Sequence, residues 1–344
     1  MTMHYRLHSR RALLGAAAAL IAAAGSAQMA FAADKLVVGA LRFTSHSAGF
    51  VALEKGYFKQ EGLNVEFRFF QAAAPTAVAV ASGDADFAIA GITGGFINLA
   101  GKGAIRAVGG VLHESKGVDG MALLASKKAY EAGLTKPAHL KGKSLALTQF
   151  GSTFHYMGAV TAEKFGFSIK DIRLRPLQKV GAMIGALKSG QVDAMFMVPH
   201  IAKPLARGGA AKIVGWLRDW HPDYQITALI TSTRNIEKRR GLVEKFLRAY
   251  ARGIADFNRV MLDQKKDPAA VEAMVKTIHK YVYTSRPYAK AARSIKAGAM
   301  YLNPGASIDV ASVKRQLEWN QSQGFVKKDI TLEQVVDTSF VKTN

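Results

Sequence analysis

The chain has 344 residues, of which 49% are hydrophobic and none is cysteine. This length suggests about two domains of roughly 150 residues each, and the hydrophobic content excludes wholesale disorder. The lack of cysteine excludes a disulfide framework, a thiolate metal site, a cysteine nucleophile and lipid anchoring through an N-terminal cysteine. The formal net charge of +22 indicates an anionic partner, which is nucleic acid, anionic lipid or an acidic small molecule.

The first 32 residues are typical of an export signal. Three arginines and no acidic residue accompany an apolar run over 13–24, which is too short for a membrane span of about 20 residues. The adjacent Arg10 and Arg11 fit ordinary secretory export and twin-arginine export equally well. Cleavage is expected near Ala32/Ala33, so a retained anchor is the less favoured alternative. We therefore expect a periplasmic protein of net charge +19, with no other segment apolar enough to span a membrane.

From residue 35 onward, short apolar runs alternate with helical patterns. Apolar runs that end in glycine are typical of buried strands, and strand–helix alternation at these lengths is typical of α/β folds with a parallel sheet. The expected elements are a strand over 35–40, a helix over 49–60, a strand over 63–69, a helix over 75–82 and a strand over 86–90.

The same series recurs in the middle of the chain. Its expected elements are a strand over 144–148, a helix over 154–165, a strand over 172–177, a helix over 180–188 and a strand over 193–198. A local signature links the two series at an offset of 107 residues: Ser-Gly-Asp-Ala-Asp at 82–86 matches Ser-Gly-Gln-Val-Asp at 189–193. The match falls at the same place in each series, which predicts two α/β lobes of similar topology.

Two apolar, strand-like stretches, 121–125 and 225–231, are placed where the chain would cross between the lobes. These crossings predict interleaved lobes, with lobe 1 formed by 33–122 and 226–344 and lobe 2 by 123–225. Beyond Asn235 the pattern is helical, with apolar residues at spacings of three and four. Helices are expected over 241–261, 268–281 and 307–323, as an extension packed on the first lobe.

Three motifs, in order, resemble a known family. They are Glu-Lys-Gly-Tyr-Phe-Lys-Gln-Glu-Gly-Leu-Asn-Val at 54–65, Leu-Lys-Gly-Lys-Ser-Leu-Ala at 140–146 followed by Gly151-Ser152, and Leu-Lys-Ser-Gly-Gln-Val-Asp-Ala at 187–194 followed by Pro199. The chain resembles periplasmic substrate-binding proteins of ABC transporters, of the sulfonate, nitrate and thiamine-precursor type (SsuA/THI5-like, NMT1). The resemblance spans roughly residues 34 to 260 and is more specific for the family than for the ligand.

This resemblance implies an α/β fold of the type II periplasmic binding proteins, with two lobes, a hinge between them and a helical C-terminal extension. It implies a solute bound in the cleft between the lobes and delivered to an inner-membrane ABC permease with a cytoplasmic ATPase. We expect a monomer with no cofactor, no metal and no nucleic-acid partner.

Candidate ligand-binding residues follow the strands, because ligands of open α/β sheets bind beyond the carboxyl ends of the strands. Hydroxyls, imidazoles and glycine amides at helix starts donate hydrogen bonds to anionic oxygens, and nearby phenylalanines offer an apolar wall. Ordinary helix capping and turn glycines are the alternative reading of the same residues. The candidates are Phe43, Thr44, Ser45 and His46; Thr93 and Gly94; Phe150, Gly151, Ser152, Thr153, His155 and Tyr156, with Phe154 as a wall residue; Pro199 and His200; and, more weakly, Gln71 and His113.

The leading hypothesis for function is a receptor for a small organic anion, a sulfonate or carboxylate with an aromatic or alkyl body. A thiamine-precursor pyrimidine or another nitrogen heterocycle is the alternative ligand, and a stand-alone ligand sensor is the alternative role. The basic residues are spread along the chain without interleaved aromatics, which disfavours a nucleic-acid groove. An enzyme is disfavoured because the sequence has no Gly-x-Ser-x-Gly elbow, no His-Glu-x-x-His helix and no phosphate-binding Gly-x-x-x-x-Gly-Lys loop.

Overall fold

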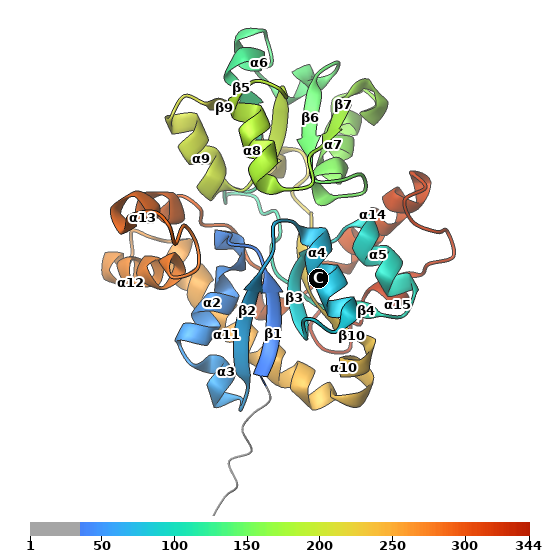
Figure 1. Cartoon of the computed structure of the whole chain (residues 1–344), viewed down its shortest axis with the longest axis vertical. Helices are drawn as coiled ribbons and strands as arrows, with labels where there is room; N and C mark the ends of the chain where they lie inside the picture. The colour runs from blue at the N-terminus through green and yellow to red at the C-terminus, as the bar shows by residue number, and fades with distance from the viewer. Residues whose placement is uncertain (1–34) are drawn as a thin grey trace, which may run out of the picture. The chain divides into compact units, whose positions relative to one another are not determined.

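Residues 35–344 of the chain are described by a computed structural model, in which two five-stranded sheets are covered by helices (Figure 1). The predicted export signal and its cleavage site near Ala32/Ala33 lie outside the described residues. Residues 35–344 pack as one unit. No helix in this part of the chain is long and apolar enough to cross a membrane.

The first sheet has the strand order β2-β1-β3-β10-β4. Its strands are β1 (Lys35–Ala40), β2 (Asn64–Phe69), β3 (Phe87–Gly91), β4 (Ile105–Gly110) and β10 (Thr227–Ser232). Strand β1 is parallel to β2 and β3, whereas β10 is antiparallel to β3 and β4. A strand from late in the chain therefore completes a sheet that is otherwise built from the first 110 residues.

The second sheet has the order β7-β6-β8-β5-β9. Its strands are β5 (Ala122–Ser126), β6 (Ser144–Leu147), β7 (Arg173–Pro176), β8 (Ala194–Met197) and β9 (Ala211–Trp216). Strand β5 is antiparallel to β8 and β9, as β10 is to its neighbours in the first sheet. The two sheets thus share one topology, and the chain passes between them twice, from β4 to β5 and from β9 to β10 (Figure 1).

The repeated sequence signature has the same structural role in both sheets. Gly83 and Gly190 end helices with φ of 85° and 72°, a left-handed conformation that glycine adopts without steric cost. The aspartate that follows accepts a backbone N–H at the start of the neighbouring strand. Asp86 accepts from Val37 at 2.9 Å, and Asp193 accepts from Ser144 at 2.7 Å.

The first predicted helix is divided in two. In place of one helix over 49–60 the structure has α2 (Ser47–Glu54) and α3 (Tyr57–Gln60). Gly56 lies between them with φ of 70°, which an α-helix does not accommodate. The single-helix prediction was wrong because the glycine at this position ends one helix and starts the next.

Helices α4 to α9 lie within the two series or next to them in the chain. Their bounds are α4 (Ala73–Ser82), α5 (Gly94–Gly101), α6 (Lys127–Glu131), α7 (Thr153–Lys164), α8 (Val180–Lys188) and α9 (Pro199–Arg207). Short 3-10 helices are η2 (Thr44–His46), η3 (Pro137–Leu140), η4 (Ile169–Asp171), η5 (Leu217–Asp219) and η6 (Pro304–Ala306). Helices α5 and α9 and strands β4 and β9 were not among the elements expected from the sequence.

The last third of the chain is helical, as predicted. Its helices are α10 (Thr233–Lys238), α11 (Arg240–Met261), α12 (Pro268–His279), α13 (Tyr288–Lys296), α14 (Val310–Ser322) and α15 (Leu332–Val335). Helix α11 packs along α2 and α3, and α15 packs on α5 and β4. Phe246 of α11 stacks on Phe87 of β3, with ring centroids 3.9 Å apart, so the extension shares the core of the first sheet. Helix α13 also contacts α9 beside the second sheet.

Candidate ligand-binding site

A cavity lies where the carboxyl ends of β1, β3, β6 and β8 meet the two connections between the sheets. It encloses about 610 Å³ not occupied by protein atoms, its open mouth included. The residues that line it are Leu41, Phe43, Ser45, His46, Ala72, Ala73, Gly91, Thr93, Leu112, Met121, Thr148, Ser152, Thr153, Phe154, Met157, Val180, Met197, Val198, Ile226 and Thr227.

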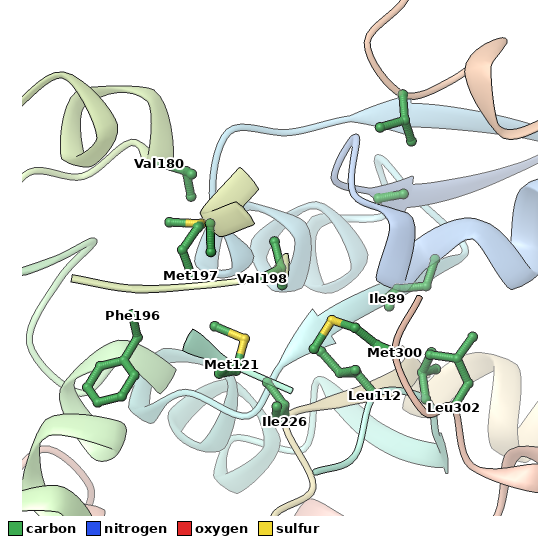
Figure 2. Close-up of a cluster of buried hydrophobic side chains, with 14 of the residues drawn as sticks. Ile89, Leu112, Met121, Val180, Phe196, Met197, Val198, Ile226, Met300 and Leu302 are labelled. Atoms are coloured by element: carbon green, nitrogen blue, oxygen red, sulfur yellow. The ribbon is translucent and has the colours of Figure 1, made fainter. Parts of the chain in front are cut away.

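Most of the wall is apolar and comes from both sheets. Figure 2 shows Val180, Met197 and Val198, from α8 and the end of β8, near Met121 and Ile226 at the starts of β5 and β10. These side chains are buried. The wall suits an aromatic or alkyl body, because methionine and branched side chains fill irregular apolar space.

The polar part of the wall consists of hydrogen-bond donors without ionised side chains. Seven polar residues line the cavity, and no Lys, Arg, Asp or Glu of residues 35–344 does so. The seven are Ser45, His46, Thr93, Thr148, Ser152, Thr153 and Thr227. Thr93, Ser152 and Thr227 already accept backbone N–H groups, so their hydroxyl protons remain to be donated. Such a wall favours a ligand group with several acceptor oxygens.

Two of these hydroxyls also begin helices. Thr93 accepts from Phe96 N at 3.1 Å at the start of α5, and Ser152 accepts from His155 N at 3.4 Å at the start of α7. Both side chains therefore cap the helices that they begin, as the alternative interpretation of the sequence predicted. Because each helix start carries partial positive charge, the cavity gains a positive field from the backbone. At Thr93 and Ser152, capping the helix and donating a hydrogen bond to a ligand are therefore compatible roles.

His46 enters the cavity as a neutral donor. Burial lowers its pKa to about 3, so the ring is uncharged at neutral pH. Its Nδ1 accepts from the Leu41 backbone N–H at 3.2 Å, which leaves the proton on Nε2. No group of residues 35–344 accepts a hydrogen bond from this Nε2–H, and His46 lines the cavity. His46 therefore offers an N–H donor rather than a cation.

The loops of the two sheets touch around the cavity. Gly94 N donates to Gly151 O at 2.9 Å, which joins the start of α5 to the loop before α7. A Cβ placed on Gly91 would lie 2.8 Å from the Thr153 methyl group, so a larger residue here would force the two loops or the Thr153 side chain to shift. The cavity is thus enclosed from both sides in this conformation.

On the other side of the cavity, Thr44 and His200 join the loops. The Thr44 hydroxyl donates to Gly298 O at 2.8 Å and lies 2.9 Å from His200 Nδ1, so Nδ1–H is the donor of that second bond. Burial lowers the pKa of His200 to about 3. The His200 Nε2 has no partner in the described part of the chain. His200 thereby contributes to the contact between sheets rather than to the cavity wall.

The predicted site residues divide into two groups. Those that line the cavity are Phe43, Ser45, His46, Thr93, Ser152 and Thr153, together with Phe154. Those that are not part of its lining are Thr44, Gln71, Gly94, His113, Phe150, Gly151, His155, Tyr156, Pro199 and His200. Contact of any of these residues with a ligand remains a prediction.

Several residues of the second group have other partners. The ring of His155 packs on Phe150, Trp319 and Phe325, with its Nδ1 accepting from Gly151 N at 3.1 Å. Tyr156 lines a separate surface hollow with Trp319. His113 Nε2 lies 3.2 Å from Asp309 Oδ2, which accepts the hydrogen bond, in a third hollow.

Most of the apolar wall was not predicted from the sequence. Met121, Met197 and Ile226 are strand-end residues that look like ordinary core in the sequence. The only available signal was their position at the predicted strand ends and crossings. In residues 35–344 no group of three or more His, Asp or Glu side chains is arranged to hold a metal.

The chain matches the family described as NMT1/THI5 like over residues 43–259. Among solved structures it is similar to the alkanesulfonate-binding protein SsuA from Xanthomonas axonopodis pv. citri bound to MOPS, with 19% identity, a TM-score of 0.70, and coverage of 89% of this chain and 98% of that chain. It is similar to the periplasmic nitrate-binding protein NrtA from Synechocystis PCC 6803, with 14% identity, a TM-score of 0.70, and coverage of 89% and 86%.

A third similar structure is that of a DSZB mutant in complex with biphenyl-2-sulfinic acid, with 15% identity, a TM-score of 0.55, and coverage of 89% of this chain and 97% of that chain. A search of curated protein sequences finds no significant match. At these identities the structural likenesses establish the fold, the two-lobed α/β fold of periplasmic binding proteins. The match over residues 43–259 establishes that the chain belongs to the NMT1/THI5-like family.

Proposed function

We propose that this protein is the periplasmic solute-binding component of an ABC importer and that it binds a small organic anion with an apolar body. A single observation carries the ligand class: seven residues with a hydroxyl or imidazole group line a mostly apolar cavity that no ionised side chain of residues 35–344 lines. Donors without carboxylates favour an acceptor-rich head such as a sulfonate or carboxylate. The apolar wall favours an aromatic or alkyl body.

The head group is held by neutral donors and helix starts. Uncharged hydroxyls and the starts of α5 and α7 stabilise an anion without the desolvation cost of burying a cation beside it. The basic surface adds a general field that raises the local concentration of small anions. The sulfonate MOPS and biphenyl-2-sulfinic acid in similar structures are compatible with this ligand class.

The proposed lobes are 33–122 with 226–344, and 123–225, and the connections between the sheets would act as the hinge. Binding would favour the closed arrangement, in which Gly94 N bonds to Gly151 O, and the closed form would dock on the permease. A neutral nitrogen heterocycle is the alternative ligand, since a wall without ionised groups also accepts a neutral body.

The test uses Thr153, which lines the cavity and whose hydroxyl makes no hydrogen bond to residues 35–344. Thr153→Val keeps the shape and removes the donor. We expect benzenesulfonate, measured by isothermal titration calorimetry, to bind at least tenfold more weakly to this variant, because hydrogen bonds to charged groups are worth about 1.5–3 kcal/mol.

Thr233→Val is the matched control. Thr233 is the first residue of α10 after the capping Ser232, as Thr153 is the first residue of α7 after the capping Ser152, but it lies outside the cavity. This control should bind benzenesulfonate within twofold of the unaltered protein. Equal affinities for both variants would overturn the site, and a preference for neutral pyrimidines over anions would favour the alternative ligand.

A further inference from the structure

A second hollow adjoins the cavity at its mouth. It is lined by Leu41, Arg42, Phe43, Phe69, Phe70, Gln71, Val180, Gly181, Ile184 and Ile201, and it encloses about 660 Å³ of space, open solvent included. Its walls come from the loops after β1 and β2 on one side and from α8 and α9 on the other. We call it the mouth groove.

The mouth groove adjoins the cavity directly. Leu41, Phe43 and Val180 line both spaces, so these three side chains form the partition between them. Phe43, in the middle of the loop after β1, is only half-buried. A ligand longer than the cavity would extend past this partition into the groove.

The mouth groove carries the cation that the cavity lacks. The Arg42 guanidinium lies 3.8 Å from the centroid of the Phe69 ring and donates through one nitrogen to Tyr281 O at 2.8 Å. It forms no ion pair with a carboxylate of residues 35–344. A guanidinium has five N–H donors, and the stacked ring fixes its plane. The group is therefore oriented and has donors to spare for an anion.

The rest of the groove is apolar. Half-buried Phe69, Phe70, Ile184 and Ile201 provide its walls. Gly181 leaves one side open, since a Cβ at this position would meet no atom within 4 Å. From the cavity into the mouth groove, a ligand would therefore meet neutral donors first and apolar walls next. At the end it would meet one cation that has no carboxylate partner among residues 35–344.

We propose that the ligand site has two compartments and takes an anion with two acidic ends. The head would occupy the cavity, an aromatic or alkyl body would pass Phe43 into the mouth groove, and the second acidic group would pair with Arg42. This inference rests on the proposed function and narrows its ligand class to elongated dianions.

The test compares biphenyl-4-carboxylate with biphenyl-4,4′-dicarboxylate, two probes that differ only in the second acidic group. The dicarboxylate should bind the purified protein at least fivefold more tightly in calorimetry. Arg42→Gln should abolish this preference while changing the affinity for the monocarboxylate less than threefold. Arg68→Gln is the control, because it removes the same charge from an exposed side chain next to Phe69 that does not line the groove. It should keep the preference.

A second variant fills the groove without altering charge. Gly181→Leu places a side chain in the groove, whereas Gly185→Leu places one on the same helix, also in open space, outside it. Both exchanges favour the helix, so both variants should fold. We expect Gly181→Leu to weaken dicarboxylate binding at least tenfold and to leave benzenesulfonate, a probe for the cavity alone, within twofold. Gly185→Leu should leave both unchanged.

The outcomes separate this inference from the proposed function. Benzenesulfonate binding together with equal affinities for the two biphenyl probes would overturn the two-compartment site and leave the proposed function standing. Loss of the preference in Arg68→Gln as well as Arg42→Gln would also overturn it, since net charge would then explain the effect. Binding of none of the three probes would contradict both proposals.

Discussion

The two β-α-β-α-β series, 35–91 and 144–197, have one strand order but present different groups to the cavity. In the first series the short helix η2 supplies Ser45 and His46, and in the second the start of α7 supplies Ser152 and Thr153. Each loop also contains a histidine whose Nδ1 accepts a loop amide. Only His46 faces the cavity, because His155 packs on Trp319 and Phe325 of the C-terminal extension.

This difference indicates that the backbone frame of each series, meaning its strands and its paired aspartate, is separable from the ligand site. Strand order and the paired aspartates depend on backbone hydrogen bonds that both series share. The cavity depends on which side chain each loop turns inward. The extension contacts the loops of both series, but its Trp319 and Phe325 pack on the ring of His155, so His155 becomes part of the packing whereas His46 lines the cavity.

The largest effect is expected where the two frames differ in strength. Asp193 accepts from both the backbone N–H and the hydroxyl of Ser144, at 2.7 and 2.8 Å, whereas Asp86 accepts from Val37 N. Hydrogen bonds to charged groups contribute about 1.5–3 kcal/mol each, and they are not additive. Asp193→Ala should therefore lower the free energy of unfolding by about 3 kcal/mol and Asp86→Ala by about 2 kcal/mol in urea denaturation. A larger loss for Asp86→Ala would contradict this ranking.

The next effect concerns the two imidazoles and acid. Burial lowers the pKa of His46 to about 3 and that of His155 to about 4. Below pH 6.5 each histidine is protonated in the unfolded chain but stays neutral in the folded chain. The free energy of unfolding therefore falls as the pH falls toward the folded pKa. Between pH 6.5 and 5, the unaltered protein should lose up to about 2 kcal/mol of unfolding free energy through His46, and His46→Gln should not show this loss. Urea denaturation at each pH measures it.

His155→Gln tests the same comparison in the second series. It should also reduce the loss of unfolding free energy in acid, over a pH range that ends near pH 4. Binding separates the two residues, since only His46 lines the cavity. We expect His46→Gln to weaken benzenesulfonate binding and His155→Gln to leave it within twofold. Equal binding losses would show that the two loops are less different than their geometry indicates.

The smallest effect should be the same in both series. Gly83 and Gly190 have left-handed φ values, and a Cβ at either position would meet no atom closer than 3.6 Å. The cost of alanine is then that of the backbone conformation alone, about 1 kcal/mol. Gly83→Ala and Gly190→Ala should each lower the free energy of unfolding by that amount, within about 0.5 kcal/mol of each other. Unequal losses would indicate that the shared signature is not structurally equivalent.

Much of the fold could be predicted because its elements have strong local patterns. The strand over 35–40 was found as β1 because an apolar run ends in glycine, and the repeated Ser-Gly signature marked two equivalent helix ends. Helix α5 and strand β4 were missed because residues 94–110 are rich in glycine and small side chains, which weakens any periodicity. The break at Gly56 was missed because glycine is tolerated within helical patterns.

The candidate site was predictable in its loops and not in its wall. Thr93, Ser152 and Thr153 stand at helix starts, which the sequence marks with hydroxyls before apolar runs. The apolar wall escapes such reasoning, since Met121 and Ile226 follow no motif and come together only because the chain crosses between the sheets twice.

The sequence by itself determined the two repeated α/β series, the helical last third, the family resemblance and the loops that carry polar groups. Tertiary structure decided which of those groups share a cavity. Thr153 and His155 are about 200° apart around α7, so one faces the cavity and the other the aromatic packing. The net charge of +22 likewise gave no sign that the cavity would have only neutral donors, because burial excludes unpaired cations and leaves Arg42 at the mouth.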